Sequence, residues 1–435
     1  MHRLVLLGFA AFLASLLAYS EIGLAPDFYW HLKTGLDLVE AGKSAFVDHY
    51  SYSFPGEPLA FATPIFDVTL ALFYKLGSGA FGVQTFLFLI FCGALVIFSK
   101  TMSRMQVPMH LQLLGMLGLS MTFRIRYEPR PEMFGFLFIG LMLYLYFLVD
   151  RTEKSQLSRR IYIPYVLLLL LWTNVHTSSI LGYAIGAALF LKIAIRQFED
   201  KSDRASWMLW SGAGVASLVV GFFNRSFENI LLHVFLPKEG TLDNEIAEFQ
   251  PIDFELIGLP LQAVLILSLV GIGLSIKRKR IADAFLVAVF LMYAFNMRRM
   301  LGLFPLVAMP FLIEHFNWIF VQAKAHAKRS LALSLYALGP ILLLVAVGPY
   351  LVASAATSTK LYTVSISDEQ QPREIVTYMK EKDLKGRIRN EYVSGGYLLL
   401  NLSEENKIFI DGRANVLYPP SFVRDYMKAS YNSLA

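Results

Sequence analysis

Long apolar runs separated by short polar loops dominate this chain of 435 residues. A membrane-spanning helix needs about 20 mainly apolar residues, and about eleven runs approach that length. They cover residues 3–20, 80–99, 108–124, 132–149, 161–174, 178–195, 206–223, 259–276, 281–297, 300–320 and 331–353. The pattern predicts a mainly α, polytopic membrane protein with about 11 transmembrane helices.

The first apolar run has two interpretations. MHRLVLLGFAAFLASLLAYS has the basic start and apolar centre of a secretory signal peptide. It lacks a convincing cleavage site with small residues, and polar residues that suit a functional site follow it directly. We therefore interpret it as a retained first span.

The basic residues of the loops predict the orientation, because Lys and Arg collect on the cytoplasmic side of membrane proteins. They cluster at every second connection, at residues 100–104, 151–160, 196–204, 277–280 and 324–329. All of these loops are cytoplasmic only if residues 64–77 do not cross the membrane. That segment is short and carries Asp67 and Lys75, so we expect a helix that lies along the interface.

A cytoplasmic N-terminus and two regions follow from this orientation. Residues 1–353 form the transmembrane domain, with outer loops at 21–79 and 224–258, and two interfacial helices are expected in the first of these loops. Residues 354–435 are polar and form a small extracytoplasmic α/β domain. In it, PREIVTYMKEKD predicts a helix, and RIRNEYV and KIFIDG predict strands. Whether the chain continues past Ala435 stays open.

Composition supports the membrane class. Mean hydropathy is +0.52 and charged residues make up 17% of the chain, against about 25% in soluble domains. The net charge of +6 comes mostly from loops that set topology, so we expect no nucleic acid partner. Cys92 is the single cysteine, which excludes an intrachain disulfide.

Six arginines lie on the side that should be poor in positive charge. Arginines that break the charge rule are costly and usually functional, and guanidinium groups suit forked contacts with phosphate. These arginines therefore predict a phosphate-bearing lipid ligand, with Arg130 the leading candidate. The alternative is an interfacial position with ion pairs to acidic neighbours in the chain. The six are Arg124, Arg126, Arg130, Arg225, Arg298 and Arg299.

Acidic residues of the first outer loop are candidates for a catalytic base. Asp27 follows Pro26 at a helix start, and His31 lies one turn later on the same face. Asp48 and His49 belong to a second polar stretch, VDHYSYSFPGEP. The alternative is a helix cap for Asp27 and a turn residue for Asp48. The spacing of Asp27 and His31 also suits a divalent metal, but no third ligand is fixed, so no metal ligand is assigned.

Other polar residues of the outer side are weaker candidates. Each has a structural alternative: a hydrogen-bonded turn for the Asn and His pair, and a strand-to-turn signature for the tail residues. The acidic run of the second outer loop is typical of a solvated face. The alternative is that it lines an acceptor site. These candidates are Asn174, His176, Arg225, Asp411 and Arg413.

The layout of these motifs resembles the GT-C-fold glycosyltransferases, which use polyprenyl-phosphate-linked sugars. PDFYWHLKTG, VDHYSYSFPGEP, RPEMFGFLF, WTNVHTSSILG and IDGRANVLYP together are similar to bacterial inner-membrane members of that superfamily. TPIFDVTLALFYKLGSGAFGVQTF is similar to a stretch of protein O-mannosyltransferase and aminoarabinose transferase relatives. Ala62, Thr63 and Pro64 stand where such relatives carry a His-Glu-Trp-type motif, which leaves the acceptor open.

The resemblance implies a membrane glycosyltransferase of the bacterial cytoplasmic membrane. The carboxylate of Asp27 would be the catalytic base, the donor a polyprenyl-phosphate-linked sugar, and the acceptor a glycan, lipid or protein on the outer face, with inversion at the sugar's anomeric carbon. The competing interpretation is a non-catalytic scaffold or a lipid-linked-sugar transporter in envelope polysaccharide assembly. A transporter should show inverted repeats and polar residues at mid-membrane, whereas the polar residues here cluster on one face.

Overall fold

The computed structural model describes most of the chain. The described residues are 2–19, 22–23, 26–123, 126–153, 156–198, 214–217, 219, 247–255, 257–326, 366–367, 371–414 and 416–432. Arg124 and Arg225 lie outside them, as do the expected span at 331–353 and most of the one at 206–223.

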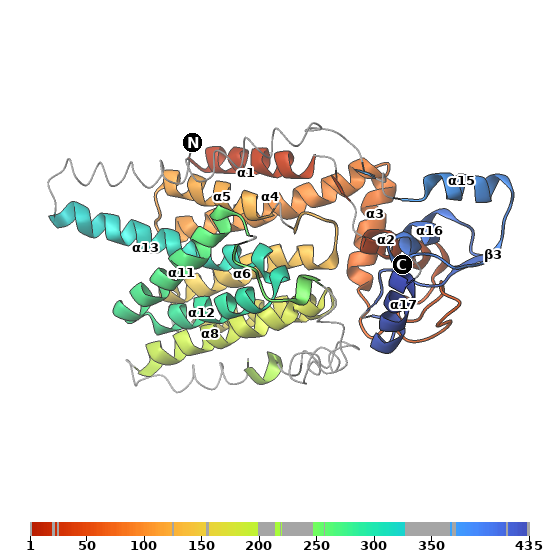
Figure 1. The fold of residues 1–435 in the computed structure, drawn as a ribbon. Coiled ribbons are helices and arrows are strands. Elements are labelled where there is room, and N and C mark those ends of the chain that lie inside the picture. The colour runs from red at the N-terminus through yellow and green to blue at the C-terminus, as the bar shows by residue number, and fades with distance from the viewer. Residues whose placement is uncertain are drawn as a thin grey trace.

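A bundle of long apolar helices forms the larger part of the molecule (Figure 1). Each expected span that is described contains one of these helices, because a buried apolar run satisfies its backbone polar groups best as a helix. The bundle consists of α1 (His2–Ala18), α4 (Ala80–Arg104), α5 (Met109–Phe123), α6 (Phe134–Leu148), α7 (Ile163–Thr173), α8 (Ile180–Phe198), α11 (Leu259–Lys277), α12 (Ile281–Asn296) and α13 (Phe304–His326).

Within the described residues, four helical segments are long and apolar enough to cross a membrane. They are Ala80–Arg104, Pro131–Arg151, Thr177–Arg196 and Phe304–Gln322. Shorter apolar helices of 10–17 residues accompany them. The mainly helical, multi-span class is thus confirmed, while the number of about eleven spans stays a prediction.

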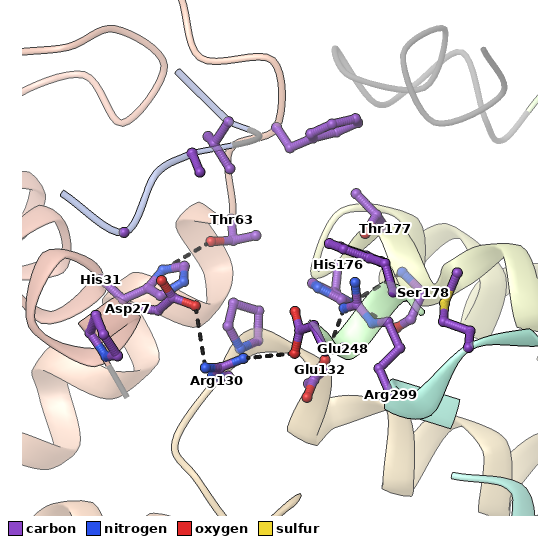
Figure 2. A pocket seen from close by; sticks show the side chains of 18 of the residues that line it. Asp27, His31, Thr63, Arg130, Glu132, His176, Thr177, Ser178, Glu248 and Arg299 are labelled. Atoms are coloured by element: carbon purple, nitrogen blue, oxygen red, sulfur yellow. Dashed lines mark hydrogen bonds and ion pairs between the residues drawn. The ribbon is translucent and has the colours of Figure 1, made fainter. Parts of the chain in front are cut away.

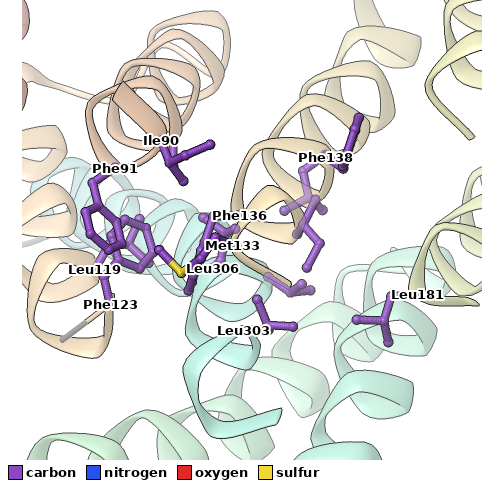
Figure 3. Packing of buried hydrophobic residues seen from close by; sticks show 14 of the residues in the cluster. Ile90, Phe91, Leu119, Phe123, Met133, Phe136, Phe138, Leu181, Leu303 and Leu306 are labelled. Carbon is purple, nitrogen blue, oxygen red and sulfur yellow. The ribbon is translucent and has the colours of Figure 1, made fainter. Parts of the chain in front are cut away.

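Phenylalanine side chains pack with leucine, isoleucine and methionine side chains between the helices of the bundle (Figure 3). The ring of Phe123 on α5 packs on Phe91 of α4 and Phe136 of α6, with centroids 5.6 and 4.7 Å away. Glycine brings helices close together: a Cβ on Gly115 would overlap Phe98 and Ile313 on neighbouring helices. Small residues at such crossings are typical of packed membrane helices.

Two shorter helices, α2 (Pro26–Ala41) and α3 (Pro64–Leu76), lie across one end of the bundle (Figure 1). Pro64 is the first residue of α3, a position where its fixed backbone angle favours the start of a helix. The two helices approach closely, because a Cβ on Gly35 of α2 would overlap the backbone oxygen of Asp67 on α3. These are the helices expected in the first outer loop.

The C-terminal part lies at the same end of the molecule (Figure 1). It consists of β2 (Ile366–Ser367), α15 (Arg373–Glu381), β3 (Gly386–Ile388), α16 (Tyr392–Asn401), β4 (Asn406–Ile408) and α17 (Pro420–Asn432). The parallel strands β3 and β4 are joined by α16, and β2 pairs in parallel with β1 (Ile22–Gly23) from the first outer loop. The expected helix is present as α15, whereas each expected strand is present only in part. Of RIRNEYV only Arg387 and Ile388 belong to β3, and Tyr392 and Val393 begin α16 instead; of KIFIDG only Lys407 and Ile408 belong to β4.

The first outer loop and the C-terminal part form one unit. The backbone N–H of Tyr52 donates to the carbonyl of Ile408 at 3.0 Å, and that of Ala60 donates to the carbonyl of Val416 at 2.8 Å. The first outer loop thus pairs with the end of β4 through an isolated bridge at Ser51 and Ile408, and it bonds to the segment that follows β4.

Short helical turns complete the connections at and around the bundle ends. They are the 3-10 turns η2 (Pro131–Met133), η3 (Val149–Arg151), η6 (Thr177–Ser179), η7 (Ala247–Phe249) and η8 (Arg298–Gly302), and the π-helical turn η5 (Ser158–Tyr162).

Candidate functional site

A cavity of about 590 Å³ lies where the bundle end meets the C-terminal part. Its charged side chains come from α2, the turn before α6, η7 and η8, whereas α17 and the residues after β4 contribute apolar and tyrosine side chains. Figure 2 shows the charged part, which brings together residues that lie far apart in the sequence. Among them are Asp27, His31, Arg130, Glu132, His176, Glu248 and Arg299.

Asp27 lies in the first turn of α2 and lines the cavity. One carboxylate oxygen is 3.7 Å from Nη2 of Arg130, and the other accepts a long hydrogen bond of 3.5 Å from Nε1 of Trp30. Burial raises the pKa of Asp27, and the positive charge of Arg130 and the His31 ring oppose that shift. Asp27 therefore holds a proton more readily than an exposed carboxylate does.

The backbone of the C-terminal part limits the space around Asp27. A Cβ on Gly412 would overlap the Oδ1 atom of Asp27. Tyr392 donates a hydrogen bond from its hydroxyl to the Gly412 carbonyl at 3.2 Å. A side chain at position 412 would therefore shift the Asp27 carboxylate, and glycine leaves it in place.

Arg130 lies between three carboxylates. Its guanidinium contacts Asp27 at 3.7 Å, Glu128 at 3.0 Å and Glu248 at 3.3 Å. The next residue is Pro131, and Arg130 has the extended backbone that proline imposes on its predecessor. Although burial alone would lower the pKa of Arg130, these carboxylates raise it above its ordinary value. Arg130 is therefore a fixed positive charge.

Arg299 carries a second positive charge into the cavity. It donates to Glu132 at 3.0 Å, and its guanidinium lies 4.9 Å from the ring centre of Phe249. Arg126 contacts Glu132 at 3.1 Å and Glu248 at 2.9 Å. It therefore links the carboxylate that holds Arg299 to one that holds Arg130. The arginines of the cavity are thus held by acidic partners, which fix the guanidinium planes.

His176 begins the turn η6 and faces the cavity. Its Nδ1 accepts a hydrogen bond from the backbone N–H of Ser178 at 3.1 Å. Burial, with the positive charge of Arg299, lowers the pKa of His176 to about 3. The ring is neutral at physiological pH and adds no charge to the site.

His31 lies one helical turn after Asp27 and also lines the cavity (Figure 2). Its Nδ1 is 2.6 Å from Oδ1 of Asp67 on α3, and the ring stacks on Trp30 at 3.5 Å. Thr63 donates to the same Asp67 oxygen at 3.2 Å. Burial raises the pKa of Asp67, and the His31 ring opposes the shift.

Three candidates meet in a different place, away from this cavity. Arg413 donates to Asp48 at 2.7 Å and to Asp411 at 2.9 Å. The side chains of the three are 0–1% exposed. Asp48 also accepts hydrogen bonds from the backbone of Tyr50 and the hydroxyl of Ser51. Asp48 and Asp411 thus hold the first outer loop to the C-terminal part, and the structure does not bring either to the cavity.

The remaining candidates do not line the cavity either. His49 contacts the carbonyl of Ser44 at 3.1 Å. Asn174 donates to the carbonyl of Leu170 in its own helix at 2.9 Å. Arg298 donates to the carbonyl of Pro251 at 3.1 Å, so the tight turn at 296–300 directs only Arg299 inward.

A metal site with three ligands is not formed by the described residues. Within these parts of the chain, no group of three or more His, Cys, Asp or Glu side chains lies close enough to hold an ion. Asp27 and His31 share one helix face, as their spacing predicts, but the Nδ1 of His31 is engaged by Asp67.

Several site residues have no distinctive sequence signal. Glu248 belongs to the acidic run that suggests a solvated face, yet it contacts two of the arginines. Asp67 has one usable signal, since it is an acidic residue in an otherwise apolar helix. Gly412, Tyr392 and Tyr418 line the cavity from the C-terminal part. Gly412 and Tyr418 belong to the IDGRANVLYP stretch, whereas Tyr392 has no sequence signal.

Comparisons with known proteins place the fold. No protein-family model and no curated protein sequence matches the chain. Two solved structures of an oligosaccharyltransferase from Archaeoglobus fulgidus are similar, with TM-scores of 0.63 and 0.57 at 12% and 14% identity. One is tethered to an acceptor peptide that contains an NVT sequon, and the other holds an inhibitory peptide and a dolichol-phosphate.

These matches cover 94% of this chain, and the chain spans about two thirds of the archaeal protein, 64% of its length. At such low identity the likeness shows the fold, which is the GT-C fold of that glycosyltransferase. With its apolar helices, the chain is an integral membrane protein of this architecture. The GT-C fold expected from the sequence is confirmed.

Proposed function

We propose that this protein is a membrane glycosyltransferase that moves a sugar from a polyprenyl-phosphate donor to an acceptor on the extracytoplasmic face. One observation carries the proposal: Asp27 and Arg130 lie 3.7 Å apart in a cavity where loops of the bundle meet the C-terminal part. A base and a fixed cation are the two groups that transfer from a lipid phosphate requires. The solved oligosaccharyltransferase that holds a dolichol-phosphate has the same fold.

Asp27 acts as the general base in this proposal. As the acceptor oxygen or nitrogen bonds to the anomeric carbon, its proton passes to the Asp27 carboxylate. The bond between the anomeric carbon and the phosphate oxygen breaks, and both electrons stay on the phosphate. Attack from the face opposite the phosphate inverts the anomeric carbon. The raised pKa of Asp27 suits this role, because a more basic carboxylate takes a proton more readily.

Arg130 and Arg299 bind the donor phosphate, with Arg126 as their support. Charge builds on the leaving phosphate during transfer, and a preorganised guanidinium stabilises it most where water is excluded. Both arginines contact carboxylates in the structure, Arg130 with Glu248 and Arg299 with Glu132. A phosphate in the cavity would replace part of those contacts, and Glu248 is the partner with the more exposed side chain.

The apolar part of the cavity suits the rest of the reactants. Trp30, Phe61, Phe249 and Tyr418 add aromatic surface to the lining, beside which a sugar ring can pack. We place the protein in the bacterial cytoplasmic membrane, with the N-terminus cytoplasmic and the C-terminal part outside. Its partners are a polyprenyl-phosphate-linked sugar, membrane lipid, and an acceptor glycan, lipid or protein. The proposal assigns no cofactor, and whether transfer needs a divalent metal is left to experiment.

Asp27→Asn tests the proposal. The purified protein in lipid vesicles is given a panel of labelled polyprenyl-phosphate sugars, and transfer to added acceptors or release of the sugar is followed. The wild type should transfer or release sugar, and the variant should lose the activity while it keeps its thermal stability. Glu40→Gln, on the same helix at an exposed salt bridge with Lys75, is the matched control. Near-normal turnover by Asp27→Asn would overturn the assignment of Asp27 as the base, whereas no transfer or release by the wild type would favour the scaffold interpretation.

A further inference from the structure

One titratable side chain of the cavity, His31, has no role in the transfer proposed for Asp27 and Arg130. It is 4% exposed, and it lines the cavity on the same face of α2 as Asp27. The two are close enough for the ring to influence the charge of the Asp27 carboxylate. A buried imidazole beside a proposed base is a candidate for a second proton carrier.

The partner on α3 fixes the orientation of the ring. Nδ1 of His31 is 2.6 Å from Asp67, and that carboxylate oxygen also accepts the hydroxyl of Thr63. A carboxylate that accepts both bonds requires the proton of the imidazole to be on Nδ1. Trp30 stacks on one ring face and Phe66 meets the ring edge-on at 5.0 Å, so rotation is restricted.

This arrangement leaves Nε2 as the unprotonated nitrogen. Within the parts of the chain that the structure describes, the ring makes its hydrogen-bond contacts at Nδ1, with Asp67 and Thr63. Because His31 lines the cavity, Nε2 is the nitrogen left to meet a reactant there. His176, which is neutral, lies across the cavity from His31 (Figure 2), and the two rings interact only electrostatically.

We propose that His31 is a further catalytic residue, which accepts through Nε2 the proton that Asp27 has taken from the acceptor, and that Asp67 is its positioning residue. The inference rests on the proposed function. After transfer, the proton leaves the Asp27 carboxyl and bonds to Nε2, which restores the Asp27 carboxylate and forms an imidazolium. Asp67 stabilises this cation through the Nδ1–H bond. The Nε2 proton then passes to water in the cavity, and the site is ready for the next acceptor.

His31→Gln separates this role from that of Asp27. The first transfer, measured with enzyme in excess of donor, should stay within about twofold of wild type, whereas steady-state turnover falls by about tenfold or more. Imidazole added to His31→Ala should restore turnover. His49→Gln, a histidine of the same loop outside the cavity, should leave both phases unchanged. Equal loss in both phases, or no loss in either, overturns the proposal.

Asp67→Asn tests the positioning role, because an asparagine can still accept the Nδ1–H bond without the negative charge. We expect a fall in turnover between those of wild type and His31→Gln, again without loss of the first transfer. No transfer by the wild type with any donor would instead refute the proposed function.

A second measurement does not depend on transfer. Nitrogen NMR of protein labelled at histidine, with His31→Gln for assignment, reports which ring nitrogen carries the proton. The proposal expects Nδ1–H with a bare Nε2 at neutral pH. The opposite tautomer would overturn it whatever the activity, because Nε2 could then accept no proton.

Discussion

Two clusters in this molecule combine arginine with carboxylates, and they differ in what surrounds them. In the sealed cluster, Arg413 contacts Asp48 and Asp411, and all three side chains are 0–1% exposed. In the open cluster, Asp27 and Arg130 have side chains that are 28% and 19% exposed and face a cavity. The residue types are the same, so exposure to a cavity, rather than residue type, decides which cluster can meet a substrate.

The sealed cluster joins distant parts of the chain. Asp48 belongs to the first outer loop, and Arg413 to the segment after β4. Two carboxylates around one guanidinium leave no room for a ligand, and the ring of Tyr50 lies 5.3 Å from the cation. Removal of one partner from such a buried group strands the other charges in a dry environment. Its role is therefore structural.

In the open cluster the arginines are only partly enclosed. Its arginines are held by carboxylates on one side and reach the cavity on the other. Glu248 lies in a short turn and is the most exposed of the carboxylates that contact two arginines. An anion can therefore enter this cluster without breaking the fold.

The largest expected effect on stability comes from Arg413→Met. It leaves Asp48 and Asp411 buried without their cation, so we expect a loss of about 3–5 kcal/mol. The protein should melt at a lower temperature in detergent, and a protease should cleave the C-terminal part more readily. Lys43→Met, at an ion pair closer to solvent, is the control and should have a small effect. A stable Arg413→Met variant would break the distinction between the clusters.

Arg130→Gln should have the opposite effect, a large loss of transfer activity with little change in stability. Loss of one preorganised cation at the phosphate should reduce transfer by about 10²–10³-fold. Stability should change little, because the side chains of Glu128 and Glu248 are 37% and 29% exposed and keep contact with water when Arg130 is replaced. Arg130→Lys keeps the charge without the fork and should recover only part of the activity. Steady-state kinetics and melting curves on the same preparations check both expectations, and a melting loss as large as that of Arg413→Met would contradict them.

The dependence on pH gives a smaller and finer test. Asp27 must be ionised to accept a proton, and burial raises its pKa above the ordinary value of about 4. Transfer should therefore be present at high pH and be lost as the pH falls through this raised pKa. Because Arg130 lowers the pKa of Asp27, Arg130→Gln should move the loss to higher pH. A profile that stays flat down to pH 4 would exclude Asp27 as the base.

The bundle and the helices of the first outer loop could be predicted from sequence alone. Apolar runs of membrane length become helices almost regardless of context. The charge pattern also placed Asp27, Arg130, His176 and Arg299 on one side, and these four line the cavity. The pattern left ion pairs with acidic neighbours as an alternative, and Arg126 and Arg130 do pair with Glu132 and Glu128. It could not show that Glu248, from a distant loop, pairs with both arginines.

The sealed cluster and the partner of His31 could not be predicted. Asp48 and Arg413 are separated by 365 residues, and His31 and Asp67 by 36. The first contact depends on how the first outer loop folds against the C-terminal part, and the second on how α2 packs against α3. Local patterns carry no information about either packing. Asp48 consequently has the same sequence signal as Asp27, although only Asp27 reaches the cavity.

A paired measurement on Asp27→Asn and Asp48→Asn tests the central claim most directly. Sugar transfer from a polyprenyl-phosphate donor and the melting temperature would be measured on each variant in the same lipid preparation. We expect Asp27→Asn to lose transfer by about 10²–10⁴-fold with an unchanged melting temperature, and Asp48→Asn to melt earlier while the protein that stays folded still transfers sugar. Full transfer by Asp27→Asn, or loss of transfer by folded Asp48→Asn, would contradict the assignment of the open cluster as the reacting site.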